Sequence, residues 1–189
     1  MPRKQKQLQF FILGGYLLGM LVTMLLRGRL VFPKDWLEIV GLFLGGVLGW
    51  VMVWLDRVAY VLILHPEVQI SQYVKYHTKR RNYREAWSLL ERRQGELEKL
   101  TTRSVLFQVA WVLLAIFAIT SVASMFGKML VMGLGLRVMV EEWSEYGKDK
   151  QGLKKKLFWQ IKREVTNEEL KWYMYVSSGV FAWLTWLLV

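Results

Sequence analysis

The sequence contains no cysteine, and only three prolines and two histidines occur among its 189 residues. A chain without cysteine has no disulfide bonds, no thiolate metal site and no cysteine nucleophile. Acidic residues are also few, 15 against 26 lysines and arginines, which gives a net charge of +11. Hydrophobic residues make up 54% of the chain, more than the roughly 45–50% of ordinary soluble proteins. This composition predicts an integral membrane protein.

Four apolar runs are long enough to cross a bilayer: 8–26, 36–56, 105–123 and 172–189. At about 1.5 Å per residue, each run approaches the roughly 30 Å thickness of the hydrocarbon core. A fifth run, 124–140, lies at the short end of this range and is either a full span or a re-entrant element. We therefore expect an all-α, polytopic helix bundle that forms a single membrane domain.

The distribution of basic residues predicts the topology. If 124–140 returns to the side on which the N-terminus lies, 22 lysines and arginines share that side and only four lie opposite. Without the return the division is even, so the positive-inside rule favours five membrane elements. We expect the N-terminus in the cytosol, the segments 65–104 and 141–171 also in the cytosol, and the chain in a bacterial inner membrane.

The first polar segment, 65–104, has the pattern of one amphipathic helix. Its large side chains recur at heptad positions among many basic residues, and these positions are Tyr73, Tyr76, Tyr83, Trp87, Leu90 and Leu97. Aromatic rings beside basic residues can also bind nucleic acid. Because the rings share one helical face, the pattern favours a protein partner or anionic lipid headgroups over nucleic acid.

The second polar segment, 141–171, carries a row of apolar residues at four-residue spacing: Leu153, Leu157, Ile161 and Val165. The basic residues beside this row are Lys154, Lys155, Lys156, Lys162 and Arg163. The combination predicts a basic helix that lies on an anionic membrane surface. Thr166 and Glu169 have capping-box spacing and predict that the last helix begins here.

Glycines recur at four-residue spacing in the first two runs. Gly41, Gly45 and Gly49 form a GxxxGxxxG series, and Gly15 and Gly19 form a GxxxG pair. Small residues at this spacing let two helices approach closely within a membrane. The short connection between the runs favours packing of the first two helices on each other, with homodimerisation as the alternative.

Asp56, Arg57 and Arg137 are a candidate interfacial charge site, because ionisable groups at membrane depth are functional candidates. Their positions near the ends of apolar runs favour the simpler interpretation of interfacial side chains and one salt bridge between helices.

Sequence motifs for catalysis are missing: there is no HExxH, GxSxG, P-loop or Gly-rich dinucleotide fingerprint. We therefore expect a protein that is not an enzyme and that has no cofactor or metal site. The favoured function is a scaffold, assembly factor or accessory subunit whose basic cytosolic face binds anionic lipid and a protein partner. The alternative is a small transporter, channel or insertase-like protein, which the glycine-containing fifth element favours.

Overall fold

The computed structural model describes residues 3–29, 31, 34–59, 61, 68–92, 101–160 and 165–189. Within these residues the chain forms eight α-helices and no strands, which confirms the all-α prediction. The helices, with a short 3-10 turn η3, are α1 (Arg3–Leu26), α2 (Trp36–Ala59), α3 (Gln69–Lys79), α4 (Tyr83–Arg92), η3 (Thr101–Arg103), α5 (Val105–Thr120), α6 (Met125–Tyr146), α7 (Lys150–Leu157) and α8 (Asn167–Leu188).

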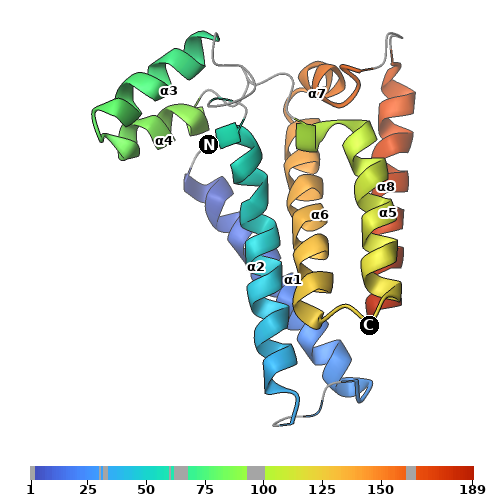
Figure 1. Cartoon of the computed structure of the whole chain (residues 1–189). Helices are drawn as coiled ribbons and strands as arrows, with labels where there is room; N and C mark the ends of the chain where they lie inside the picture. The colour runs from blue at the N-terminus through green and yellow to red at the C-terminus, as the bar shows by residue number, and fades with distance from the viewer. Residues whose placement is uncertain are drawn as a thin grey trace.

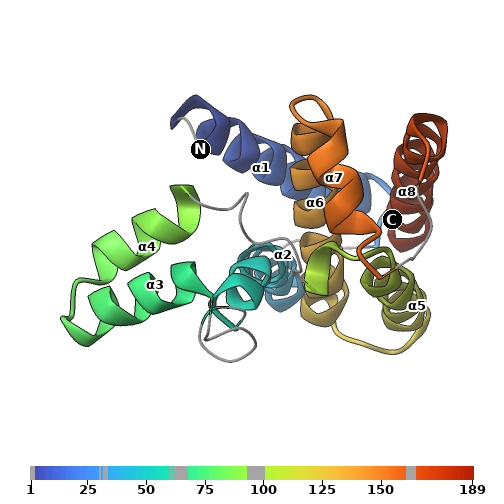
Figure 2. The same ribbon diagram turned by 90° about the horizontal axis from the view of Figure 1, so that it is seen from above.

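Five long helices, α1, α2, α5, α6 and α8, form a bundle with α6 at its centre (Figures 1 and 2). The start of α1, the α3–α4 hairpin and α7 lie at one end, which we call the polar end. The end of α1, the start of α2, the connection 121–124 and the C-terminus lie at the opposite end, which we call the turn end. Helix α6 runs from the turn end back to the polar end, the direction expected for 124–140.

Two stretches, Gln7–Leu26 in α1 and Trp36–Asp56 in α2, are long and apolar enough to cross a membrane. Helix α5 is apolar but shorter, with 16 residues, because Ser121 ends it earlier than the expected 105–123. Helix α8 begins where the sequence predicts: the Thr166 hydroxyl accepts from the Glu169 backbone N–H, and the Glu169 carboxylate accepts from the Thr166 N–H.

The closest helix pair is α2 with α6, and the α2 glycines make this approach possible. A Cβ atom at Gly45 would lie 2.3 Å from the Phe126 carbonyl oxygen, and one at Gly49 would lie 2.0 Å from the Leu130 carbonyl oxygen. Gly41 likewise faces the Phe126 backbone, at 3.2 Å. The GxxxGxxxG series therefore packs on α6 backbone.

The expected packing of the two glycine series on each other is corrected by this geometry. Gly15 and Gly19 of α1 have open space where a Cβ would lie, and α1 meets α2 instead through Leu17, whose side chain packs on Gly46. Helix α6 occupies the glycine face of α2, so the glycines of α1 do not pack there.

The segment 65–104 does not form the single amphipathic helix that the heptad pattern predicts. Helices α3 and α4 are separate and fold into a hairpin, with a break at residues 80–82 where Arg81 has a positive φ of 57°. A non-glycine residue in this left-handed region ends a helix. The tyrosines Tyr73, Tyr76 and Tyr83 are therefore divided between two helices. Leu97 and the side chains of Trp87 and Leu90 lie outside the described residues.

Helix α7 faces the bundle and not the lipid surface that the sequence predicts. Leu153 and Leu157 are almost fully buried and pack with Leu170 and Met174 of α8. The apolar row therefore stabilises the contact of α7 with the polar end of the bundle. Of the predicted lipid-facing basic residues, Lys155 is exposed and Lys156 is partly buried, while Lys162 and Arg163 lie outside the described residues.

Candidate functional site

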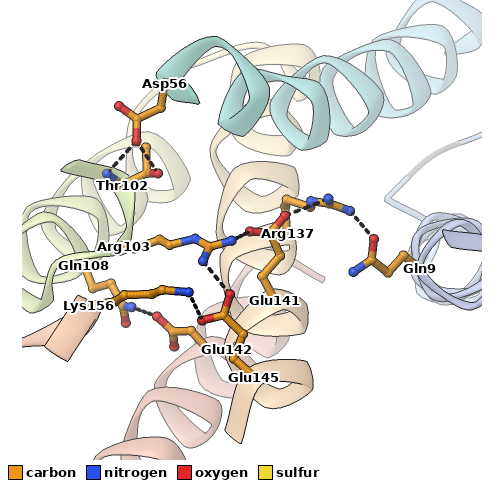
Figure 3. Close-up of polar contacts among 10 residues, drawn as sticks. All are labelled: Gln9, Asp56, Thr102, Arg103, Gln108, Arg137, Glu141, Glu142, Glu145 and Lys156. Carbon is orange, nitrogen blue, oxygen red and sulfur yellow. Dashed lines mark hydrogen bonds and ion pairs between the residues drawn. The ribbon is translucent and has the colours of Figure 1, made fainter. Parts of the chain in front are cut away.

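The last three turns of α6 carry four charged residues, Arg137, Glu141, Glu142 and Glu145, at the polar end of the bundle. The first three have side chains that are almost inaccessible to solvent. Buried charges are costly unless each has a partner of opposite charge or hydrogen bonds. Partners come from α1, η3, α5 and α7, and together they form an ionic cluster (Figure 3).

Arg137 connects α6 to α1 and α2. Its guanidinium pairs with the Glu141 carboxylate at 2.6 Å and donates to the Gln9 side-chain oxygen at 2.8 Å. It also lies over the Trp50 ring of α2, 4.8 Å from the ring centroid. The guanidinium therefore has a carboxylate, an amide and an aromatic face around it, and these contacts offset the cost of its burial.

Arg103 connects η3 to α6. Its guanidinium bridges Glu141 and Glu145, with N–O distances of 2.5 Å to each. Burial opposes the charge of Arg103, but the two carboxylates outweigh burial and raise its pKa above the usual value. Glu145 also pairs with Lys156 of α7 at 3.2 Å, so these ion pairs hold η3, α6 and α7 together at the polar end.

Glu142 differs from its neighbours because no basic side chain pairs with it directly. One carboxylate oxygen accepts from the Gln108 amide of α5, and the other, Oε2, is buried and has no hydrogen-bond partner among the described residues. Burial is the largest effect and raises the pKa of Glu142 to about 8, although Gln108 and Arg103 act in the opposite direction. The side chain therefore carries a proton at neutral pH.

Two residues of the predicted interfacial charge site, Asp56 and Arg137, have different partners. The Asp56 carboxylate accepts from the backbone N–H and the hydroxyl of Thr102, at 3.0 and 2.7 Å, and this fixes η3 to the end of α2. Arg137 belongs to the ionic cluster, and the side chain of Arg57 lies outside the described residues. Arg137 is buried within the bundle.

One sequence pattern could have predicted part of the ionic cluster, although the predicted interfacial charge site does not use it. Arg137, Glu141 and Glu145 follow at four-residue spacing, which places them on one helical face. Gln9 and Gln108, in contrast, have no recognisable pattern, because neutral amides are common in apolar helices.

A cavity of about 270 Å³ lies beside the cluster, between α5, α6 and α8. Its walls are mostly apolar, and Gln108, Tyr173 and Ser177 are its polar side chains. The cluster itself encloses only about 10 Å³ of free space, beside Glu142 and Lys156. Polar side chains thus meet an apolar cavity at the polar end of the bundle.

Among the residues that the structure describes, no group of three or more histidine, aspartate or glutamate side chains is placed to hold a metal ion. The sequence matches no protein-family model, and comparisons with curated proteins and with solved structures give no significant match. Function must therefore be argued from the geometry of this chain.

Proposed function

We propose that the chain is a membrane scaffold, assembly factor or accessory subunit without catalytic activity. In this proposal α1, α2, α5, α6 and α8 are membrane elements, and the polar end lies in the cytosol of a bacterial cell. Two observations support the placement: α1 and α2 have the length and composition of spans, and the turn end carries only Arg27, Arg29, Lys34 and Lys128 as basic residues.

The α3–α4 hairpin is the observation that carries the proposal. Its two helices pack chiefly on each other, and both views show the hairpin extending away from the bundle (Figures 1 and 2). Tyr73, Tyr76 and Tyr83 are each close to half exposed or more, and Arg80 stacks on the Tyr76 ring at 4.4 Å. Exposed tyrosines beside arginines are typical of protein interfaces.

The ionic cluster supports a structural role in preference to transport. Its charged groups pair with one another across helices, and the space beside them would hold about one water molecule. A conducting path needs polar side chains along the whole membrane, whereas the charged groups of this cluster come from η3, α7 and the last three turns of α6, at the polar end (Figure 1). Anionic headgroups would still bind the exposed basic residues at this end, such as Arg84 and Lys155.

One experiment tests the role of the hairpin. The tagged full chain is purified from native membranes in mild detergent, and proteins present in stoichiometric amounts are identified. We expect that Tyr76→Ser combined with Tyr83→Ser removes the bound partner, while Trp159→Ser, at an exposed aromatic residue outside the hairpin, retains it. A partner that binds all three proteins equally would contradict the assignment to the hairpin.

The topology is tested separately, with a variant that exploits the absence of cysteine. Lys150→Cys places one thiol at the start of α7, on the polar end. We expect a membrane-impermeant maleimide to label it only after intact cells are permeabilised. Labelling of intact cells would place the polar end outside and would contradict the proposed orientation.

The alternative function, a small transporter, channel or insertase-like protein, is favoured by one observation: the Glu142 carboxyl group is buried, and its hydrogen bond among the described residues is with a neutral amide, Gln108. Such carboxyl groups occur in proton relays. Proteoliposomes test it, because a proton pathway through Glu142 would give a proton flux that Glu142→Gln abolishes. We expect no flux above that of empty liposomes.

A further inference from the structure

The end of the α3–α4 hairpin that lies farthest from the bundle carries a concentration of positive charge (Figures 1 and 2). Residues 79–84, which we call the hairpin tip, are all exposed, and four of the six are basic: Lys79, Arg80, Arg81 and Arg84. The next residue, Glu85, accepts from the Asn82 side-chain amide at 3.0 Å and lies 3.1 Å from His77 Nδ1. Its carboxylate therefore has partners within the hairpin, and the tip keeps a strong positive charge.

The hairpin tip lies beside the bundle at the expected level of the membrane surface. The hairpin extends sideways, and its tip lies at about the height where α1 begins and α2 ends (Figures 1 and 2). The apolar stretches Gln7–Leu26 and Trp36–Asp56 have their polar-end limits near these same helix ends. In the membrane placement of the proposed function, on which this inference rests, the tip therefore lies at the level of the lipid headgroups.

We infer that the hairpin tip binds anionic phospholipid headgroups beside the bundle. Lysine and arginine form charge-assisted hydrogen bonds with phosphate, and an anionic membrane surface attracts basic residues near it. Tyr83 of the tip is 63% exposed, and tyrosine is enriched at membrane interfaces because its ring is apolar and its hydroxyl is polar. Helix α7 is less suited to this role, because Leu153 and Leu157, which would have to enter the lipid, are buried in the bundle.

This site deepens the proposed function, which assigns the exposed tyrosines of the hairpin to a protein partner. Headgroups bound at the tip would fix the direction in which the hairpin presents Tyr73 and Tyr76 of α3. An acidic segment of a protein would also neutralise the tip. The position of the tip at headgroup level favours lipid, and the two occupants give different results in a bilayer that contains no partner protein.

Fluorescence quenching in nanodiscs tests the contact, because a chain without cysteine can carry one specific label. In Thr78→Cys the new thiol carries a fluorophore one residue before the tip, and the hydroxyl that is lost bonds the Val74 carbonyl of its own helix. The nanodiscs contain phosphatidylcholine and a tracer lipid with a nitroxide on its headgroup, with or without phosphatidylglycerol. We expect stronger quenching with phosphatidylglycerol, and added salt should remove the difference because exposed charges are screened.

A matched pair of variants tests whether the tip makes the contact. Lys79→Gln with Arg84→Gln removes two charges from the tip, and Lys155→Gln with Lys171→Gln removes two from exposed residues elsewhere at the polar end. Each basic residue near an anionic surface contributes a factor of up to about five in binding, so the tip variant should lower the ratio of bound to free hairpin about tenfold. The control variant should be quenched like the parent.

Three results would overturn the inference. Equal quenching with and without phosphatidylglycerol would show that the tip does not recognise anionic headgroups, and an equal loss in both variants would show that net charge alone is responsible. If neither lipid composition gave quenching, the tip would not reach the headgroups, and an acidic protein segment would be its occupant.

These results are independent of the protein partner, because the nanodiscs contain none. Failure to capture a partner through Tyr76 and Tyr83 would therefore leave lipid binding by the tip intact. A chain that does not enter nanodiscs would instead contradict the membrane placement, and the inference would fail with it.

Discussion

The two sides of α6 show two different uses of glycine. On the α2 side, Gly45 and Gly49 let the backbone of α2 come into direct contact with the backbone of α6. On the α5 side, Gly135 accommodates the indole ring of Trp111, because a Cβ there would lie 2.0 Å from the ring. The ring fills part of the interface and leaves the cavity beside it.

This difference separates a structural interface from one that can accept a ligand. Contact between backbones gains dispersion energy over the whole helix length and cannot adjust by rotation of side chains. Packing through a large side chain leaves irregular space that another molecule can fill. The α2–α6 interface is therefore the closely packed one, and the α5–α8 side of α6 is the one that keeps a cavity.

The largest expected loss of stability comes from a side chain that prevents α2 and α6 from packing closely. In Gly49→Leu a side chain would meet the Leu130 carbonyl oxygen, and because that atom is backbone, the helices must separate. We expect a loss of about 5 kcal/mol or more in the free energy of unfolding, measured by circular dichroism in mixed detergent micelles.

The matched control for this variant is Gly19→Leu, on the α1 face where a Cβ would meet nothing within 4 Å. We expect its free energy of unfolding to change by less than about 1 kcal/mol, since leucine also has the higher helix propensity. A comparable loss of unfolding free energy in both variants would show that the α1 glycines also make close helix contacts. It would contradict the assignment of the close glycine contacts to the α2–α6 interface.

The next largest loss of stability is expected from the ionic cluster, which holds η3 and α7 on the polar end of α6. Arg103→Met leaves the Glu141 and Glu145 carboxylates without their bridging guanidinium. Removing one partner of a buried ion pair costs about 3–5 kcal/mol, so we expect a loss of this size by the same measurement. Lys155→Met, at an exposed residue of α7, should be nearly neutral. Equal losses in the two variants would show that a change of net charge, and not the cluster, is responsible.

Local features of the fold could be predicted from the sequence. Apolar runs and capping residues located most of the helices, and the Thr166–Glu169 capping box marks the start of α8 because its signal lies within one helical turn. The charge distribution predicted that 124–140 returns to the polar end. These signals need no knowledge of which helices are neighbours.

Features that depend on the neighbour of a helix were not predicted. The apolar row of α7 shows that one face avoids water, but it does not distinguish lipid from the α8 side chains that cover Leu153 and Leu157. The same limit applies to Gly41, Gly45 and Gly49. Their spacing indicates that another helix can pack closely there, but it does not identify that helix. Glu142 lay at the end of an apolar run, and only the packing of α5 shows that it is buried.

A smaller effect is expected from the pH dependence of Glu142. Its pKa is raised to about 8, chiefly by burial, so the folded state binds a proton more tightly than the unfolded chain. Stability is therefore greatest at low pH for this group and falls as pH rises through 8, by up to about 1.4 kcal/mol per pH unit. The groups around it are Arg103, Gln108, Glu141 and Glu145.

Thermal unfolding of the wild type and of Glu142→Gln between pH 6 and pH 9, an interval chosen around the pKa of about 8, measures this contribution. The wild type should lose stability across the interval, while the variant, which cannot ionise at this position, should lose clearly less. Parallel curves for the two proteins would mean that Glu142 is not the group that titrates, and its burial beside the cavity would then be in doubt.

The smallest expected effect comes from filling the cavity. The Ser177 hydroxyl donates only to the Met174 carbonyl within its own helix, so replacing it leaves no partner unsatisfied on another helix. In Ser177→Leu the new side chain enters apolar space, and we expect a gain of about 1 kcal/mol in the free energy of unfolding without ligand. Ala110→Leu buries no such surface and should give no comparable gain. A destabilised Ser177→Leu would mean that the α5–α8 side of α6 is as closely packed as the α2 side.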